Sequence, residues 1–284
     1  MRFASAMVEG TPTFGVVDGD LLYCAPAGPG QSAGLRAAIA TGRLLDLGRD
    51  ILAAGRAVPL ERLTFQPVVA DPGKILCVGV NYVAHRSETG RSESKYPVIF
   101  TRFAESQVGH LQAILRPPES VALDYEGELA VIIGAAGRRI GRADAGRHIA
   151  GYACYNDATV RDWQRHTHQF TPGKNFPTTG AFGPWMVTAD EIADVGRLTL
   201  RTRLNGETVQ EASVADLIFD VPELIAYIST FTQLQPGDVI VTGTPGGVGD
   251  RRTPPLYMRA GDRVEVEIDG IGILANPVVD EAAH

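Results

Sequence analysis

The chain has 284 residues, of which 44% are hydrophobic and 21% charged, a composition that excludes a disordered protein and allows a large core. The formal net charge of -7, without a lysine- or arginine-rich run, argues against nucleic acid as a partner. Three widely spaced cysteines and the lack of a long apolar run argue against a disulfide framework and a membrane span, so we expect a cytoplasmic protein.

Residues 1–70 are predicted to form a small N-terminal α+β domain. Asp18-Gly19 lies between two apolar runs, which is the pattern of a hairpin with a tight turn. Helical patterns follow over residues 35–43 and 44–54. Prolines and a glycine then mark a connector, so we expect residues 71–284 to form the main domain.

The main domain is predicted to be mainly β, because short apolar runs separated by turn residues dominate it. Asn205-Gly206 and Asp269-Gly270 each predict a hairpin, and a helix is predicted from Pro222 to Leu234. The other predicted strands cover residues 75–80, 97–103, 121–134, 149–155, 185–188 and 238–243. Strands and helices alternate too rarely for a doubly wound sheet, so the predicted fold class is α+β, mainly β.

The most informative stretch runs from Asp124 to Gly134. Glu126 and Glu128 are two apart in a predicted strand, so they share one face and lead into an apolar run. Asp157 ends another apolar strand and could join them. Buried carboxylates need compensation, and three carboxylates without a thiolate favour Mg2+ or Mn2+. The alternative is that the two glutamates form the solvent face of an edge strand, and their spacing alone does not decide.

Several motifs occur in one order between Lys74 and Val279. These are Val78-Gly79-Val80-Asn81-Tyr82 with His85 and Glu88 after it, Asp124-Tyr125-Glu126-Gly127-Glu128, Tyr155-Asn156-Asp157, Arg161-Asp162-Trp163-Gln164, Gly173-Lys174-Asn175-Phe176, Gly183-Pro184-Trp185 and Thr242-Gly243-Thr244-Pro245. With these motifs the chain resembles the fumarylacetoacetate hydrolase family over that range. The resemblance implies a mixed β-sandwich roll as the catalytic domain and a homodimer. It also implies a metal held by Glu126, Glu128 and Asp157, and a mobile lid that carries His85 and Glu88.

His85 and Glu88 are three apart, so in a helical lid they lie on one face and the carboxylate can orient the imidazole. This arrangement suits a water-activating dyad, and the alternative is an exposed surface pair. Lys174 could meet a substrate carboxylate or a developing oxyanion, and its alternative is a surface lysine.

Three further residues are candidates for substrate contact. Thr244 lies in a glycine-flanked turn and can offer its hydroxyl and backbone N–H to a carboxylate, and its alternative is a plain turn. Arg102 and Gln164 are candidates of lower rank.

With this resemblance we expect a divalent-metal-dependent hydrolase that cleaves a carbon–carbon bond in a small 2,4-dioxo acid, such as an acylpyruvate or fumarylpyruvate. In this hypothesis His85, supported by Glu88, deprotonates the attacking water, and the metal and Lys174 stabilise the departing enolate. The fold also hosts decarboxylases, isomerases, hydratases and lyases of oxaloacetate-like or sugar-derived 2-oxo acids, and fold alone does not choose among them. A metal-dependent small-acid binding protein is the non-enzymatic alternative.

Two other patterns are weaker. Gly30-Gln31-Ser32-Ala33-Gly34 matches the G-x-S-x-G pattern, but the residues before it are loop-like and a nucleophile elbow requires a strand there. His166 and His168 would share a face in an extended segment, as zinc ligands do, but no third ligand stands at a useful spacing. We therefore expect loop histidines without a metal.

Overall fold

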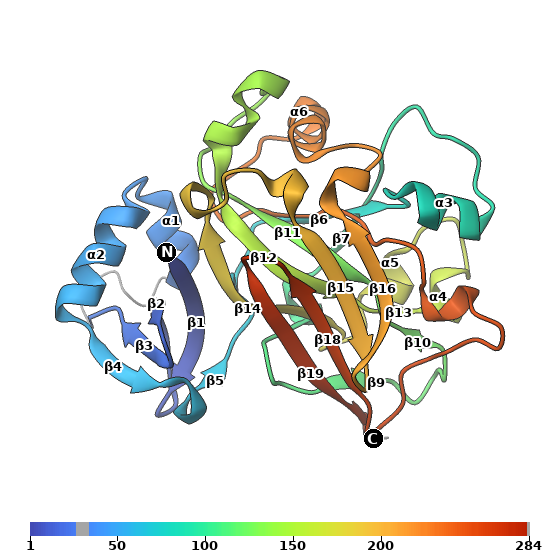
Figure 1. Cartoon of the computed structure of the whole chain (residues 1–284), viewed down its shortest axis with the longest axis horizontal. Helices are drawn as coiled ribbons and strands as arrows, with labels where there is room; N and C mark the ends of the chain where they lie inside the picture. The colour runs from blue at the N-terminus through green and yellow to red at the C-terminus, as the bar shows by residue number, and fades with distance from the viewer. Residues whose placement is uncertain (27–33, 283–284) are drawn as a thin grey trace.

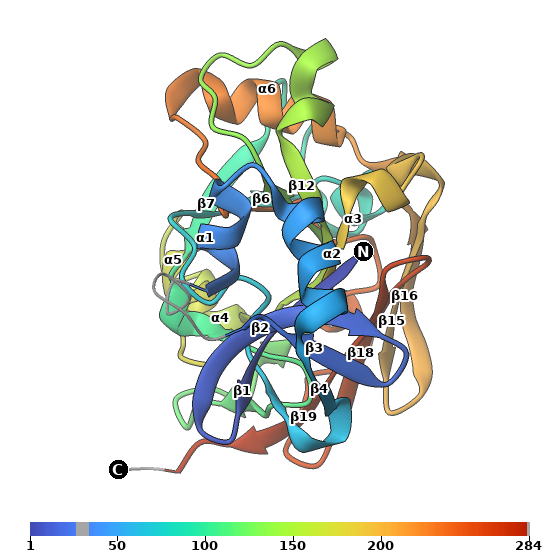
Figure 2. The same ribbon diagram turned by 90° about the vertical axis from the view of Figure 1, so that its left-hand side faces the viewer.

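The computed structural model describes residues 1–26 and 34–282, and its N-terminal part is a small antiparallel sheet beside two helices (Figures 1 and 2). Its elements are β1 (Arg2–Val8), β2 (Thr11–Asp18), β3 (Leu21–Cys24), α1 (Gly34–Ala40), α2 (Leu44–Ala54), β4 (Arg56–Pro59) and β5 (Thr64–Phe65). The predicted hairpin at Asp18-Gly19 and the helix over 44–54 are confirmed. The first helix is shorter than predicted and ends at Ala40, because Gly42 turns the chain with a left-handed φ of 68°.

The rest of the chain is mainly β. Its strands are β6 (Ile75–Gly79), β7 (Val98–Arg102), β8 (Gln107–Val108), β9 (Ile114–Arg116), β10 (Leu123–Asp124), β11 (Gly127–Ile133), β12 (Ile149–Asp157), β13 (Thr159–Val160), β14 (Gly180–Thr188), β15 (Thr199–Leu204), β16 (Glu207–Ser213), β17 (Val239–Val241), β18 (Arg263–Ile268) and β19 (Gly272–Asp280). Its α-helices are α3 (Val83–Thr89), α4 (Arg161–Gln164), α5 (Thr171–Lys174) and α6 (Val221–Phe231). The predicted α+β, mainly β class is confirmed, as are the hairpins at Asn205-Gly206 and Asp269-Gly270.

Two mixed sheets contain most of these strands, and β10 and β13 form a separate two-stranded sheet. The larger sheet has the order β4-β3-β2-β1-β14-β12-β11-β17-β6-β7, with β5 and β8 pairing at β1 and β14, and the smaller has the order β16-β15-β18-β19-β9. Strand β1 pairs with β14 through Arg2 opposite Val187 and Phe3 opposite Met186, so the N-terminal strands extend the larger sheet. The domain boundary near residue 70 therefore remains a prediction.

Strand β11 is buried on both faces, which explains its uninterrupted apolar sequence. One face packs toward the smaller sheet and the other toward the N-terminal helices. The first cluster includes Leu129, Val131, Leu200, Val266 and Leu274, and the second includes Ala130, Ile132, Leu35, Ile39 and Ile51. The apolar end of β11 is thus fixed in the core, and its polar beginning is held in place.

The single strand predicted over 121–134 is wrong, because the chain leaves the strand at Tyr125 and Glu126. Strand β10 pairs with β13, whereas β11 pairs with β12 and β17. Side chains replace the ladder at the break: the Glu126 N–H donates to Asn156 Oδ1 at 2.9 Å, and the Gly127 N–H donates to Gln210 Oε1 at 3.0 Å. The carboxylates of this stretch therefore stand where the strand opens.

Helix α6 confirms the predicted helix, although it ends at Phe231 instead of Leu234. Its start is fixed by Asp220, whose carboxylate accepts from the Glu223 N–H, with proline in the first turn. No described helix combines the length and the apolar character that a membrane crossing requires.

Candidate active site

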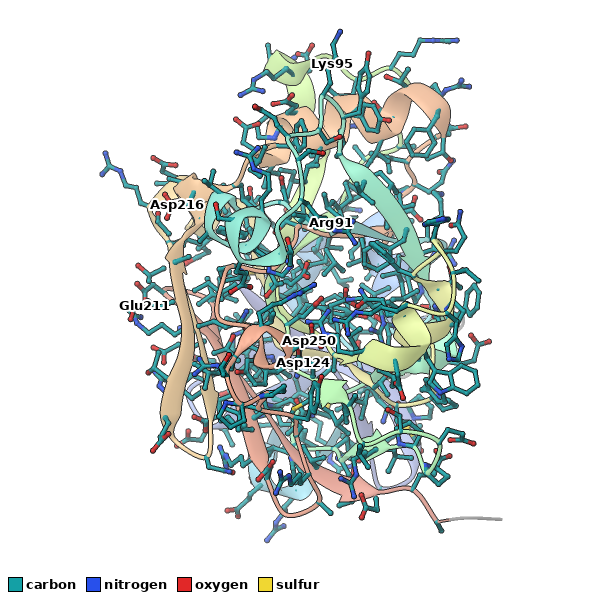
Figure 3. The ribbon with its side chains drawn as sticks, turned by 90° about the vertical axis from the view of Figure 1, so that its right-hand side faces the viewer. Arg91, Lys95, Asp124, Glu211, Asp216 and Asp250 are labelled. Atoms are coloured by element: carbon teal, nitrogen blue, oxygen red, sulfur yellow. The ribbon has the colours of Figure 1, made fainter. Side chains whose placement is uncertain are left out.

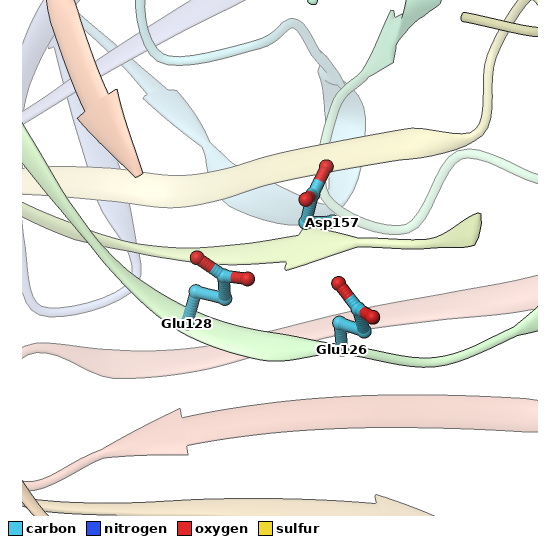
Figure 4. A group of neighbouring side chains, drawn as sticks. All are labelled: Glu126, Glu128 and Asp157. Carbon is cyan, nitrogen blue, oxygen red and sulfur yellow. The ribbon is translucent and has the colours of Figure 1, made fainter. Parts of the chain in front are cut away.

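Three carboxylates converge at the opening between β10 and β11 (Figure 4). Glu126 directly precedes β11, Glu128 is its second residue, and Asp157 is the last residue of the neighbouring β12. One oxygen of each lies within 4.8 Å of the others, and all three side chains are buried. The solvent-face alternative is therefore excluded by the structure, because a buried cluster of carboxylates faces inward.

Three buried cations surround the cluster. The Lys174 ammonium lies 2.5 Å from both Glu126 Oε2 and Asp157 Oδ2. Arg102 donates to Asp157 Oδ1 at 2.7 Å, and Arg161 Nη1 lies 2.7 Å from Glu126 Oε1. Burial raises the pKa of Glu126, but the positive charges of Lys174 and Arg161 outweigh it and lower that pKa to about 2. Glu126 is therefore held ionised.

Glu128 is the member of the cluster whose charge is least compensated. Within the described part of the chain, no lysine or arginine nitrogen lies within 4.0 Å of its carboxylate, which accepts instead from the Gly243 N–H. Burial, together with the charges of Asp157 and Glu126, raises the pKa of Glu128 well above its usual value. A divalent cation among these oxygens would supply the missing positive charge, so the residues present fit a Mg2+ or Mn2+ site.

His85 and Glu88 face the same space from helix α3. His85 Nδ1 lies 2.7 Å from Glu88 Oε1, and the other Glu88 oxygen accepts from the Gly247 N–H at 2.9 Å. Burial raises the pKa of Glu88, but the hydrogen bonds from His85 and Gly247 outweigh it and lower that pKa. An ionised Glu88 fixes the imidazole from behind, which is the arrangement needed for general acid–base catalysis.

A cavity of about 320 Å³ joins these groups. It is lined by His85, Glu126, Glu128, Lys174 and Thr244 among others. Lys174 is thus no surface lysine, since it is 1% exposed and its ammonium reaches the acidic cluster.

The other substrate-contact candidates occupy two kinds of position. Gln164 lines the cavity, and its Oε1 accepts from Arg161 Nη1 at 3.1 Å. Thr244 also lines it, with its hydroxyl donating to Gly127 O and accepting from Gln210 Nε2. Arg102 lies behind the carboxylates, where Asp157, Ala158, Ser106 and Thr179 take up its N–H groups.

Asp124 and Arg161 are parts of the site that the sequence did not single out, although both stand in motifs quoted above. Asp124 is fully buried and accepts from Arg161 Nε at 2.8 Å and from the Gly249 and Asp250 N–H groups. It thereby connects Arg161 to the loop after β17. No local signal marks this role, because the partners are 37 and 125 residues away.

The described residues support neither of the two weaker sequence patterns, the histidine pair and the G-x-S-x-G motif. His166 packs against Trp163 with ring centroids 4.8 Å apart, and His168 lines the cavity. Among the described residues, the carboxylate cluster is the one group of three or more potential ligands, so a zinc site at these histidines is not supported. Residues 30–33 of the G-x-S-x-G pattern lie outside the described residues.

Comparison with known proteins places the chain among enzymes. Residues 74–279 match the family model described as fumarylacetoacetate (FAA) hydrolase C-terminal. Over 238 residues the chain is 43% identical to the human mitochondrial oxaloacetate tautomerase FAHD2A, a match that covers 83% of this chain and 76% of the relative.

Two solved structures are similar over almost the whole chain. Fumarylacetoacetate hydrolase from Exiguobacterium antarcticum has a TM-score of 0.88 and 34% identity, covering 99% of this chain and 100% of that one. Maleylpyruvate hydrolase from Sphingobium sp. SYK-6, solved with manganese(II) and pyruvate, has a TM-score of 0.82 and 31% identity, with the same coverage. By its sequence motifs, its fold and its buried carboxylate cluster, the chain belongs to the fumarylacetoacetate hydrolase family.

Proposed function

We propose that the chain is a divalent-metal-dependent enzyme that interconverts the keto and enol forms of a 2-oxo dicarboxylic acid of the oxaloacetate type. The observation that carries this proposal is the cavity in which the carboxylate cluster lies beside five cationic side chains, those of Arg91, Arg161, Arg165, Lys174 and Arg251. Such a cavity suits a small dianion. The 43% identity to an oxaloacetate tautomerase supports the same substrate type.

Glu126, Glu128 and Asp157 would hold the metal, for which Mg2+ and Mn2+ are the candidates because all three ligands are oxygens. The manganese(II) in the maleylpyruvate hydrolase structure supports this choice. When bound, the metal supplies Lewis acidity that polarises a 2-oxo carbonyl and so acidifies the neighbouring C–H bond.

The side chains of the cavity then move the proton. His85, oriented by Glu88, takes a proton from C3 of the keto form and then gives this proton to the 2-oxo oxygen, so the enol forms without a net gain or loss of protons. Lys174 places a fixed positive charge beside the acidic cluster, where it stabilises the negative charge that develops on that oxygen. The reverse sequence returns the keto form.

Hydrolysis of a 2,4-dioxo acid, which the sequence resemblance ranked first, becomes the second candidate. The specific observation in its favour is the His85–Glu88 pair, whose geometry also suits deprotonation of a water. The likeness to maleylpyruvate hydrolase supports it too. The two reactions differ in the proton that the dyad accepts, which comes from C3 of the substrate in tautomerisation and from water in hydrolysis.

The test follows both reactions in parallel with Mg2+ or Mn2+. The enol absorbance of freshly dissolved oxaloacetate reports tautomerisation, and pyruvate release from acetylpyruvate reports hydrolysis. We expect tautomerisation above the buffer rate, abolished by a chelator and lowered at least about 100-fold in His85→Ala, since general acid–base catalysis contributes roughly 10²- to 10⁴-fold. His148→Ala, outside the cavity, is the control that keeps its rate.

Each other outcome contradicts the proposal in a distinct way. Metal-dependent pyruvate release without tautomerisation would establish the hydrolytic candidate. Tight metal-dependent binding of 2-oxo acids without any turnover would indicate a binding protein.

We also propose that the enzyme works as a homodimer, as the family resemblance implies. Light scattering on the purified protein measures this directly. The mass of a single chain at working concentration would contradict it.

A further inference from the structure

A second cavity, of about 480 Å³, adjoins the first. The two are lined in common by Gly79, Val80, Arg91, Val98 and His168. Their volumes of about 320 and 480 Å³ leave additional space beyond the carboxylate cluster. Arg91 therefore lies at the junction between the first cavity, which contains the carboxylate cluster, and the second cavity.

Arg91 differs from the other cations of the catalytic cavity in having no carboxylate partner. Lys174 contacts Glu126 and Asp157, Arg161 contacts Asp124 and Glu126, and Arg165 and Arg251 both contact Asp250. Among residues 1–26 and 34–282, no carboxylate oxygen lies within 4.0 Å of the Arg91 guanidinium. Its charge is free to engage an anion.

Aromatic side chains fix where that charge stands. The guanidinium carbon of Arg91 lies 5.2 Å from the centroid of the Phe170 ring. Phe170 packs edge-on against Phe100 at 5.6 Å between centroids, and the Lys174 ammonium lies 5.1 Å from the Phe100 centroid. A short apolar wall, Phe100 and Phe170, thus runs from the catalytic lysine to Arg91.

Figure 3 views the molecule from the side on which Arg91 lies. Arg91 lies near the middle of this face beside α3, and Asp250 lies on the same face. Gly90 ends α3 in a left-handed conformation with φ of 65°, which turns the chain so that Arg91 leaves the helix direction. Arg91 is accordingly presented by a loop, on the solvent side of the aromatic wall.

We propose that Arg91 is a specificity-determining residue, which binds the distal carboxylate of a 2-oxo diacid whose two acid groups are separated by a hydrocarbon segment. This inference rests on the proposed function, which places the 2-oxo end at Glu126, Glu128 and Asp157. The hydrocarbon segment lies along Phe100 and Phe170, and the far carboxylate reaches the guanidinium, whose planar fork matches it. The substrate class thereby extends from the four-carbon acid to longer 2-oxo diacids.

The test compares acids that differ only in the distal group. 2-Oxoadipate and 2-oxohexanoate have the same chain length, and calorimetry with Mn2+ measures the binding of each without requiring turnover. We expect the wild type to bind the diacid about 10-fold more tightly, the modest preference of a partly exposed ion pair. Arg91→Gln should abolish the preference, and Arg91→Lys should keep part of it.

Arg86→Gln is the matched control, because Arg86 lines the second cavity but already faces Glu93 at 3.8 Å. It should keep the wild-type preference. Equal binding of the two acids by the wild type, or an undiminished preference in Arg91→Gln, would overturn the role of Arg91. No metal-dependent binding of either acid would also overturn the inference, and the same titration with oxaloacetate shows whether the proposed function fails with it.

Discussion

Arg102 illustrates how single residues prepare the site from behind. Its side chain is fully buried, and its guanidinium donates to Asp157 Oδ1, Ala158 O, Ser106 Oγ and Thr179 Oγ1. Asp157 can therefore point one oxygen toward Arg102 and the other toward Lys174. Arg102 positions the Asp157 carboxylate and does not itself line the cavity.

Replacing Arg102 by methionine should lower the free energy of unfolding by about 3–5 kcal/mol, because the buried Asp157 carboxylate loses a partner. Urea denaturation of the metal-free protein measures the loss. Arg116→Met is the control: its pair with Asp280 is partly exposed, so the expected loss is under about 1 kcal/mol. Similar losses in both variants would contradict this role.

His110 should make stability depend on pH outside the site. Its Nδ1 accepts from the Ala275 N–H at 3.0 Å, and burial, aided by the charge of Arg263, lowers its pKa to about 4. The unfolded chain, with a histidine pKa of about 6.5, binds the proton first, so stability is lost as pH falls from about 6.5 to about 4.

The measurement is the urea midpoint of wild type and His110→Gln across that range. The variant should show the shallower decline, since glutamine does not titrate there. A parallel decline in both proteins would show that other groups carry the acid sensitivity.

At the scale of elements, local signals predicted the hairpins and helices well. Asn205-Gly206 forms the turn as expected, with both residues at left-handed φ, 54° and 86°. The break between β10 and β11 could not be predicted, because the group that receives the Gly127 N–H, Gln210, is 83 residues away. The local sequence gives no sign of the break, which depends on side chains that are distant in the sequence.

Gly206→Ala should lower the free energy of unfolding by about 1–2 kcal/mol, the cost of a side chain in the left-handed region. A Cβ at Gly206 would meet nothing within 4 Å, so no steric clash contributes. Gly146 also has open space but lacks a left-handed φ, so Gly146→Ala is the control and should change stability little. Thermal unfolding of the two variants makes the comparison, and equal shifts would contradict the turn assignment.

At the scale of the whole molecule, the larger sheet is what assembles the site. It brings β11 and β12 side by side, so that Glu128 and Asp157 meet, while α3 and α5 add His85 and Lys174 at the same end. The sequence could predict the i, i+3 pairing of His85 with Glu88, because it follows from helix geometry. It also predicted that Glu126 and Glu128 converge, although Glu126 lies outside the strand from which this was argued.

The long-range contacts of the site could not be predicted in this way. Lys174 meets Glu126 across 48 residues, and Arg102 meets Asp157 across 55. These residues become neighbours only when the sheet folds. That Arg91 differs from the other cations of the cavity is also seen only in the structure, because it depends on which carboxylates pair with the others.

Calorimetric titration of Mn2+ into the metal-free protein measures whether Glu126, Glu128 and Asp157 together hold one divalent cation. We expect one Mn2+ site per chain in the wild type and in the control Glu207→Gln, whose side chain is exposed. In Glu128→Gln we expect the affinity for Mn2+ to fall at least about 100-fold. Loss of a residue that only supports a ligand lowers metal affinity by roughly 10- to 100-fold. Wild-type affinity in Glu128→Gln would contradict the account.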